Sequence, residues 1–371
     1  MRVLVDAHMV GSQETGNETY IVELLRAMAR LPGVECAAAV APGGPPSSLV
    51  GIGVELLPLA SANNWHRLAF GLPLLCRRWC ADILHVTYVG PVHAPCPMVV
   101  TVHDVSYKRY PQCFSRRDRL LFATLLALSV RRAAAVITVS DSSRADIAEF
   151  YPGTEHRLHR SYEAAGESFK PVVREAALHV CKRYGVSGDF VLAVGNLQPR
   201  KNLLRILSAF RRLVVQGESG LQLVLVGKDK GLAGYLQHEG ADLLEAGRLL
   251  LTGYVPAEDL PSLYSAARVF VYPSLYEGFG LPVLEAMACG APAIASNASS
   301  LPEVAGDAAI LVDPFDVDAI ASAMRRVLAD RELALDLAQR GLKRASCFSW
   351  EKTAQETLAA YQAAIERWRK R

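Results

Sequence analysis

The 371-residue chain lacks the features of several protein classes. No run approaches the roughly 20 apolar residues that a membrane-spanning helix needs, and the opening MRVLVDAHMV is strand-like, without a signal-peptide cleavage site. The formal net charge of +3 is too small to indicate nucleic-acid binding. The eight cysteines are scattered singly, which is typical of buried thiols in a reducing compartment. We therefore predict a cytoplasmic protein without a nucleic-acid partner.

The sequence instead contains an alternation of short apolar runs and segments with helical spacing. Strand-like runs occur at 2–5, 37–40, 82–86, 97–104, 134–140, 190–194, 221–226, 268–274, 291–296 and 308–314. This alternation predicts an α/β fold with parallel sheets that are covered on both faces. A chain of this length is expected to form two domains and not one core.

The alternation weakens after Tyr151 and restarts beyond Pro171. We therefore predict a Rossmann-like domain over residues 1–165, a second over 170–348, and a closing helix within 349–371. Ligands of such sheets bind beyond the carboxyl ends of the strands. Two domains that face each other would hold a ligand in the cleft between them.

One stretch, YPSLYEGFGLPVLEAMACGAP at 272–292, predicts a strand, a glycine turn and a helix in succession. Pro282 suits the first turn of a helix, where its missing N–H costs nothing. Free N–H groups at Gly280, Leu281 and Val283 would then lie at the positive end of the helix dipole. This arrangement predicts an anion site, and a phosphate is its natural occupant.

Two glutamates flank this turn, Glu277 before it and Glu285 inside the helix. Acidic residues of dinucleotide-binding folds accept hydrogen bonds from a ribose diol, and we predict this role for Glu285. Glu277, at the strand end, is predicted to face the sugar that reacts. The simpler alternative makes Glu285 a first-turn partner of the helix dipole and Glu277 a solvated loop charge.

The same stretch closely resembles the signature of retaining glycosyltransferases of family 4, the glycogen-synthase-like and mannosyltransferase-like group. That signature is E-x7-E around a G-F-G-L-P turn, met here by Glu277, Gly278, Phe279, Gly280, Leu281, Pro282 and Glu285. The resemblance implies the GT-B fold and a hexosyltransferase that moves a sugar from a nucleoside diphosphate to a glycan or lipid-linked saccharide acceptor. It assigns Phe279, Gly280 and Leu281 to donor binding and makes Glu277 catalytic.

A second stretch, VLAVGNLQPRKNLLRILSAF at 191–210, is similar to the family's G-x-x-x-x-R-K-N loop. The similarity implies that Arg200 and Lys201 bind the diphosphate, since a guanidinium fork and an ammonium both suit phosphate oxygens. A solvated basic pair before a helix is the alternative. Because these cations and a helix terminus meet the charge, and no carboxylate cluster is apparent, we predict that the enzyme needs no metal and no cofactor.

A third stretch, TVHDVSYKRYP at 101–111, resembles the family's H-D-x-S/T segment. The resemblance implies that His103 is catalytic and lies near the donor sugar and the bond that breaks. A core or capping histidine at a strand end is the alternative. Asp104 is expected only to orient the loop, and the serines of residues 137–147 are expected to cap the next helix.

Two other segments bear on the donor. LTGYVPAEDL, from residue 251, resembles a family segment whose backbone, near Tyr254 and Val255, would meet the base. Residues 11–17 are predicted to form a polar loop after the first strand. This loop lacks the paired glycines of many family members, and the resemblance assigns its phosphate contacts to Gly16 and Asn17.

Two segments, 65–80 and 115–134, combine apolar residues with arginines. The simpler interpretation is two helices that cover a sheet, with solvated arginines. The alternative is a peripheral contact with anionic lipid on the inner membrane surface, near a lipid-linked acceptor.

Two rival functions are also compatible with a double-Rossmann chain. A nucleotide-sugar epimerase would change the sugar without an acceptor, but the E-x7-E pattern favours transfer. A non-catalytic partner in glycan assembly would have a degenerate site, whereas the signature side chains are all present, namely Glu277, Glu285, Arg200, Lys201 and His103.

Overall fold

The computed structural model describes residues 1–12, 15–44, 46–215, 217 and 220–370. The chain divides into two compact units: Met1–Glu163 with Ser349–Arg371 form unit 1, and Ala164–Phe348 form unit 2. The last helix therefore joins unit 1, whereas the sequence-based division kept it apart. All eight cysteines lie in these described ranges as free thiols. No helix in the described residues is long and apolar enough to cross a membrane.

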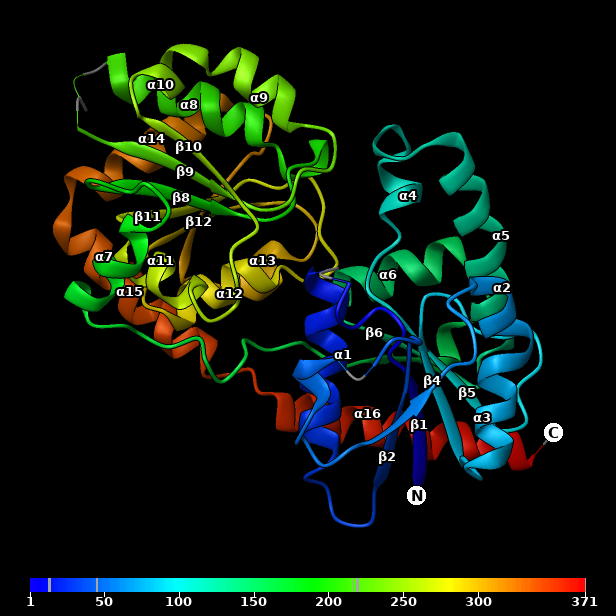
Figure 1. Ribbon diagram of the computed structural model, residues 1–371. Coiled ribbons are helices and arrows are strands. Elements are labelled where there is room, and N and C mark those ends of the chain that lie inside the picture. The colour runs from blue at the N-terminus through cyan, green and yellow to red at the C-terminus, as the bar shows by residue number, and fades with distance from the viewer. Residues whose placement is uncertain (13–14, 45, 216, 218–219, 371) are drawn as a thin grey trace. The chain divides into compact units, whose positions relative to one another are not determined.

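Unit 1 is built on a seven-stranded parallel sheet in the order β3-β2-β1-β4-β5-β6-β7 (Figure 1). The strands are β1 (Arg2–Asp6), β2 (Glu35–Val40), β3 (Glu55–Pro58), β4 (Ile83–Thr87), β5 (Met98–Val102), β6 (Ala135–Thr138) and β7 (Leu158–Arg160). The α-helices are α1 (Thr15–Met28), α2 (Asn64–His66), α3 (Leu72–Arg78), α4 (Ser106–Arg109), α5 (Arg116–Arg132), α6 (Asp141–Phe150) and α16 (Trp350–Arg369). A π-helical turn, Arg67–Gly71, joins α2 to α3, and three short 3₁₀ turns are Ser47–Leu49, Pro111–Cys113 and Glu155–Arg157.

Helices cover both faces of this sheet. Successive strand residues point to opposite faces, so neighbouring residues of one strand contact different helices. Leu84 and Val86 of β4 pack in one apolar cluster with residues of α3 and α5. His85, between them, instead forms a 2.6 Å hydrogen bond through Nδ1 with the hydroxyl of Tyr361 on α16. Helices α1 and α16 pack against each other on that second face (Figure 1).

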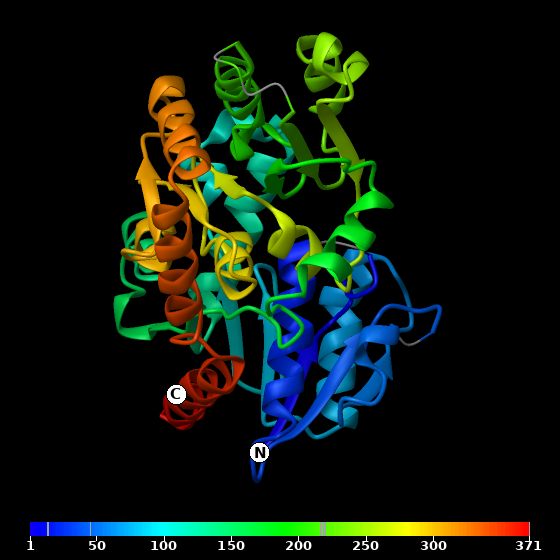
Figure 2. The same ribbon diagram turned by 90° about the vertical axis from the view of Figure 1, so that its left-hand side faces the viewer.

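Unit 2 has a six-stranded parallel sheet in the order β10-β9-β8-β11-β12-β13. The strands are β8 (Phe190–Val194), β9 (Gln222–Val226), β10 (Leu249–Gly253), β11 (Val269–Tyr272), β12 (Ala293–Ser296) and β13 (Ala309–Val312). The helices are α7 (Arg174–Lys182), α8 (Leu203–Val215), α9 (Ala233–Glu239), α10 (Ala241–Glu245), α11 (Leu260–Ala266), α12 (Leu281–Ala288), α13 (Leu301–Ala305), α14 (Val317–Ala329) and α15 (Arg331–Ala345), with a 3₁₀ turn at Pro199–Lys201. Two apolar clusters fill the faces of this sheet, and α15 packs against α12 and α14 (Figure 2).

The sequence-based strands agree with the interior of both sheets, but three strands escaped prediction. These are β3, β7 and β10, and each lies at an edge of its sheet. Strand β3 is half exposed and ends in proline, and β7 has three residues of which two are basic. An edge strand is covered less completely than an interior one, so its apolar signal is weak.

The loop predicted over residues 11–17 is shorter than expected. Helix α1 already begins at Thr15, so Gly16 and Asn17 lie in its first turn and not in a loop. Gln13 and Glu14, which the predicted loop included, lie outside the described residues. The predicted serine cap is confirmed for Ser140, which accepts a hydrogen bond from the Ser143 N–H at the start of α6. The Ser143 hydroxyl instead donates to the His103 carbonyl over 2.7 Å.

Candidate active site

A charged cluster lies where β8 and β11, adjacent strands of unit 2, reach their carboxyl ends. Arg200 and Lys201 occupy the 3₁₀ turn after β8, and Glu277 follows β11. The Glu277 Oε2 atom lies 2.8 Å from Arg200 Nη1, and Oε1 lies 2.7 Å from Lys201 Nζ. All three side chains are at least 87% covered, so both alternatives, a solvated basic pair and a solvated loop charge, are wrong.

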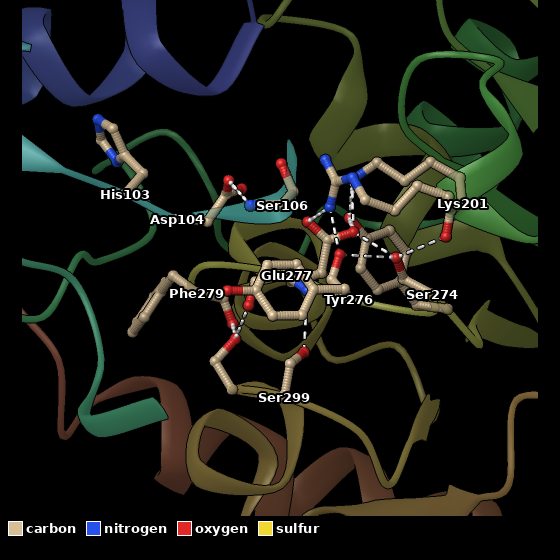
Figure 3. Close-up of polar contacts among 12 residues, drawn as sticks. His103, Asp104, Ser106, Lys201, Ser274, Tyr276, Glu277, Phe279 and Ser299 are labelled. Carbon is tan, nitrogen blue, oxygen red and sulfur yellow. Dashed lines mark hydrogen bonds and ion pairs between the residues drawn. The ribbon is translucent and has the colours of Figure 1, made fainter. Parts of the chain in front are cut away.

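Neutral donors complete the environment of this carboxylate. The hydroxyls of Ser274 and Tyr272 donate to Glu277 Oε1, the latter over 3.0 Å, and Lys201 also donates to Tyr272. The backbone N–H of Glu277 donates to Ser299 Oγ over 2.9 Å (Figure 3). Ser274, Tyr272 and Ser299 were not predicted as site residues, because hydroxyl residues carry no distinctive signal in one sequence.

The cations decide the charge state of Glu277. Burial alone would raise the pKa of Glu277. The positive charges of Arg200 and Lys201 outweigh this effect, and hydrogen bonds from Lys201 and Ser274 lower the pKa further. The pKa of Glu277 is lowered to about 2. Glu277 is therefore an ionised carboxylate throughout the physiological pH range.

The glycine turn after Glu277 requires glycine at position 280. Gly280 has φ +110°, a backbone angle that residues with a side chain rarely adopt. An added Cβ would also lie 2.4 Å from Leu301 Cδ2. Helix α12 follows with Pro282 in its first turn, as predicted. One part of the predicted anion site is wrong, because the N–H of Val283 donates to the Gly280 carbonyl over 2.9 Å. The N–H groups of Gly280 and Leu281, at the N-terminus of α12, are still predicted to donate hydrogen bonds to a bound phosphate.

Glu285 lies deeper in α12 than its predicted role requires. It is the fifth residue of the helix, so the alternative of a first-turn dipole partner is wrong. Its Oε2 accepts a 2.8 Å hydrogen bond from the hydroxyl of Tyr264 on α11, and Glu285 is 9% exposed. Burial and the charge of Glu285 both raise the pKa of Tyr264, which stays a proton donor. Contact with a ribose stays a prediction.

Two other residues that were predicted to bind the nucleotide-sugar donor, Phe279 and Val255, are buried. Phe279 is 3% exposed, its ring lies edge-on to Phe348 with centroids 5.8 Å apart, and its carbonyl accepts from Ser300 Oγ. The Val255 side chain belongs to an apolar cluster of unit 2, whereas Tyr254 beside it is 42% exposed. A contact with a nucleotide base at position 255 would therefore use the backbone, as the sequence analysis expected.

In unit 1, His103 follows β5 directly and is buried. Its Nδ1 lies 2.9 Å from Oε1 of Glu163, a buried residue that the sequence analysis did not select. The His103 ring is edge-on to Tyr20, with centroids 4.7 Å apart. Asp104 orients the following turn, as expected, because its Oδ1 accepts from the Ser106 N–H over 2.8 Å (Figure 3). The alternative of a core histidine is compatible with this burial, so the role of His103 stays a prediction.

The other predicted contacts in unit 1 are less embedded. Gly16 is exposed on α1, and a Cβ there would meet no atom within 4 Å, so space does not require glycine. Asn17 is partly buried in the same turn. Their predicted phosphate contacts stay predictions.

Acidic clusters that could bind a metal ion are absent from the described residues, where no three His, Cys, Asp or Glu side chains converge. Asp316 and Asp318 of unit 2 have the D-x-D spacing, and both have structural roles. Asp316 caps α14 by accepting from the Ala319 N–H, and Asp318 forms an ion pair with Arg212.

Comparison with known proteins matches each half of the chain to a described family. Residues 15–162 match "Glycosyltransferase Family 4", and residues 186–344 match "Glycosyl transferases group 1". Over 273 residues the chain is 38% identical to O-antigen chain mannosyltransferase B of Escherichia coli, covering 71% of this chain and 70% of that protein.

Solved structures resemble nearly the whole chain. A sucrose-phosphate synthase from Thermosynechococcus elongatus has a TM-score of 0.78 at 22% identity and covers 98% of both chains. Anabaena HepE, in complex with UDP and glucose, has a TM-score of 0.77 at 19% identity and covers 97% of this chain and 98% of its own. At these identities the likeness concerns the fold alone.

Proposed function

The chain belongs to the family 4 glycosyltransferases and has their GT-B fold, and on this premise we propose that it moves a sugar from a nucleoside diphosphate sugar to a saccharide acceptor, retaining the anomeric configuration without a metal ion. The observation that carries the proposal is the buried cluster of Glu277, Arg200 and Lys201. It offers cations for a diphosphate and a carboxylate for a sugar in one place, which is the electrostatic arrangement that this transfer requires.

The diphosphate is assigned to the cations of this cluster. The three side chains together carry one positive charge, since two cations meet one carboxylate. Arg200 can bind two phosphate oxygens with its fork, and Lys201 acts as a point charge. The N–H groups of Gly280 and Leu281 add the positive end of α12. These groups meet the charge of the leaving diphosphate without a divalent cation.

Glu277 is assigned to the sugar. A carboxylate with a pKa of about 2 stays charged and favours positive charge that develops at the anomeric carbon. Its oxygens accept from Lys201, Ser274 and Tyr272 and pair with Arg200, which makes Glu277 a poor nucleophile. This argues against a double displacement through a glycosyl–Glu277 intermediate.

We infer that the acceptor attacks from the face that the diphosphate leaves. The bond between the anomeric carbon and the phosphate oxygen breaks, and its electron pair departs with the diphosphate. The acceptor hydroxyl oxygen bonds to the carbon on the same face, and its proton passes to the departing phosphate oxygen. The configuration is then retained, with no covalent enzyme intermediate.

The relative from Escherichia coli supports a choice of substrates to test first. It is named an O-antigen chain mannosyltransferase, so mannose is the first donor sugar and a growing, lipid-linked glycan chain the first acceptor. The decisive experiment incubates the protein with a panel of nucleotide sugars and follows nucleoside diphosphate release with and without acceptors. Product NMR then reads the anomeric configuration.

The outcomes of that experiment separate the rival functions. Release that depends on the acceptor, with a retained product, supports the proposal. Conversion of the sugar without an acceptor would identify an epimerase, and binding without any turnover would identify a non-catalytic partner. An inverted product would contradict the mechanism while leaving sugar transfer in place.

A second proposal concerns peripheral membrane contact by unit 1. Segments 65–80 and 115–134 expose large apolar side chains, namely Trp65, Phe70, Leu74, Leu120 and Leu121, of which Trp65 is 64% and Phe70 66% exposed. The same two segments also contain exposed arginines, namely Arg77, Arg78, Arg116, Arg117, Arg131 and Arg132. Aromatic residues beside arginines match the interface of an anionic bilayer, where each basic residue contributes about 1 kcal/mol. A bilayer would also supply the lipid-linked acceptor.

Vesicle binding tests this contact. Replacement of Arg116, Arg117, Arg131 and Arg132 by Gln should weaken binding to phosphatidylglycerol-containing vesicles at low salt by about tenfold or more. The matched control replaces four exposed basic residues of unit 2, namely Arg325, Arg326, Arg331 and Lys343. A wild-type protein that ignores these vesicles, or equal losses in both variants, would contradict the contact.

A further inference from the structure

We propose that Glu163 is a positioning residue for the transfer reaction, which fixes the tautomer and orientation of His103 so that Nε2 offers a lone pair to a hydroxyl of the bound sugar. The inference rests on the proposed function and adds a residue to it. It starts from the contact between His103 Nδ1 and Glu163 Oε1, which are 2.9 Å apart.

The two groups are held together by the sheet and shielded from water. His103 follows β5, Glu163 lies three residues beyond β7, and β6 pairs with both strands. His103 is 8% exposed and Glu163 4% exposed. A carboxylate only accepts hydrogen bonds, so Nδ1 of the imidazole must carry the hydrogen in this contact. In the neutral ring Nε2 is then the bare acceptor.

The Nε2 atom is the feature that points to a ligand. It is buried and has no hydrogen-bond partner within the part of the chain that the structure describes. A buried polar atom without a partner is unfavourable, so a partner is expected from outside this set of residues. The hydroxyl of a sugar can donate to it. The rings of Tyr20 and Tyr88 lie against the imidazole, with centroids 4.7 Å and 5.6 Å away, and limit its rotation.

Glu163 therefore has a part that resembles that of the buried carboxylate in a serine-protease triad, which holds an imidazole in one tautomer. Without Glu163, the hydrogen can move to Nε2. The ring then offers a donor in place of a lone pair, so the sugar hydroxyl can no longer donate to His103. A purely structural role predicts no such dependence on His103. The two roles can be separated, because a positioning residue acts only through its partner.

The first test is independent of activity. Nitrogen NMR of the ligand-free protein with labelled histidine, in which the His103 signals are identified by their loss in His103→Ala, reports which ring nitrogen carries the hydrogen. We expect the Nδ1–H form in the wild type at a pH where the ring is neutral, and a growing Nε2–H fraction in Glu163→Ala. An unchanged tautomer in Glu163→Ala overturns the proposal.

The second test is a double-mutant cycle on kcat/KM for the donor. Glu163→Ala should lower kcat/KM about tenfold or more in the wild type, but less than about twofold in His103→Ala. Glu163→Gln, which keeps an acceptor oxygen, should recover part of the loss. Glu366→Gln, at an exposed carboxylate of the same unit, is the matched control. Equal losses in both backgrounds overturn the proposal.

The two tests separate the possible failures. A wild-type protein without transferase activity contradicts the proposed function, and the NMR experiment still decides whether Glu163 sets the tautomer. A wild-type transferase with an additive cycle contradicts the positioning role alone. Thermal unfolding of each variant shows whether a loss of activity reflects loss of the fold, and Glu163→Gln keeps the cycle usable if Glu163→Ala unfolds.

Discussion

The two units share one architecture, but two of their buried polar side chains, Glu277 in unit 2 and His85 in unit 1, differ in charge state. Unit 2 buries a charge: Glu277 lies between two cations, and its pKa falls to about 2. His85 in unit 1 is neutral, because burial lowers its pKa to about 3. His85 hydrogen-bonds to Tyr361 and Thr101 over 2.6 Å and 2.7 Å.

The difference indicates which buried group serves a ligand. Both ring nitrogens of His85 have partners inside unit 1, so this network is complete and connects β4, β5 and α16. A complete buried network stabilises a fold but offers nothing to a substrate. The cluster in unit 2 combines two cations with one carboxylate at a strand edge, and an arriving diphosphate can compete for those cations.

We expect the largest effect from replacing the charged Glu277. Glu277→Gln should lower turnover about 10²-fold or more, because the reaction loses the carboxylate that favours positive charge at the anomeric carbon. The affinity for nucleoside diphosphate should not fall, since Arg200 and Lys201 remain. Steady-state kinetics and calorimetry measure the two quantities, with Glu366→Gln as the control. A Glu277→Gln enzyme at the wild-type rate would mean that the E-x7-E motif has been misread.

The next effect sharpens the role of the second glutamate. Glu285→Ala should weaken nucleoside diphosphate binding by about tenfold, because hydrogen bonds from a ribose diol to a carboxylate contribute up to about 3 kcal/mol. Tyr264→Phe is the matched control: it removes the 2.8 Å hydrogen bond to Glu285 but keeps the carboxylate. Calorimetry that finds equal affinities for Glu285→Ala and the wild type would remove Glu285 from the ribose role.

These side chains also show how far the sequence reaches. Interior strands were predictable because burial on both faces gives a continuous apolar run, as in β8 and β11. The edge strands β3, β7 and β10 were not, since partial exposure dilutes that run. The start of α1 was missed because its first turn contains polar residues and a glycine.

The candidate site divides in the same way. The position of Arg200, Lys201 and Glu277 beyond the carboxyl ends of strands was predictable, since each follows an apolar run that the sequence identifies as a strand. Their mutual ion pairs were not, because pairing depends on side-chain geometry across two adjacent loops. Glu163 lies 60 residues beyond its partner His103, in a segment without a recognisable motif. No local pattern in one sequence connects such residues.

We expect a smaller effect of His85 on how the stability of unit 1 depends on pH. The unfolded chain protonates His85 near its ordinary pKa of 6.5, whereas the folded pKa is about 3. Between these values the unfolded state binds more protons, so stability falls as pH falls, by at most about 1.4 kcal/mol per pH unit. Glu277 contributes stability above its ordinary pKa of 4.5, and loses it only as pH falls from there toward 2. From pH 6.5 to 4.5 the acid loss should therefore belong to unit 1.

Tryptophan fluorescence can measure that loss selectively. All four tryptophans, Trp65, Trp79, Trp350 and Trp368, belong to unit 1. Urea unfolding at pH 6.5 and 4.5 should show a smaller loss of stability in His85→Gln than in the wild type. His93→Gln, at an exposed histidine of the same unit, should match the wild type. An equal loss of unfolding free energy between pH 6.5 and 4.5 in all three proteins would show that His85 does not control the acid destabilisation.

Removal of divalent metal ions is expected to have no effect on turnover. This tests whether the protein neutralises the charge of the diphosphate without a metal ion. A divalent cation is useful where a diphosphate would otherwise lack positive charge. Here Arg200, Lys201 and the N-terminus of α12 are proposed to supply it, so EDTA should leave turnover unchanged and added magnesium should not raise it. Lys201→Gln provides the sharper comparison: its turnover should fall in the presence and absence of magnesium alike. Activity that EDTA abolishes and magnesium restores would mean that the charged cluster does not neutralise the diphosphate alone.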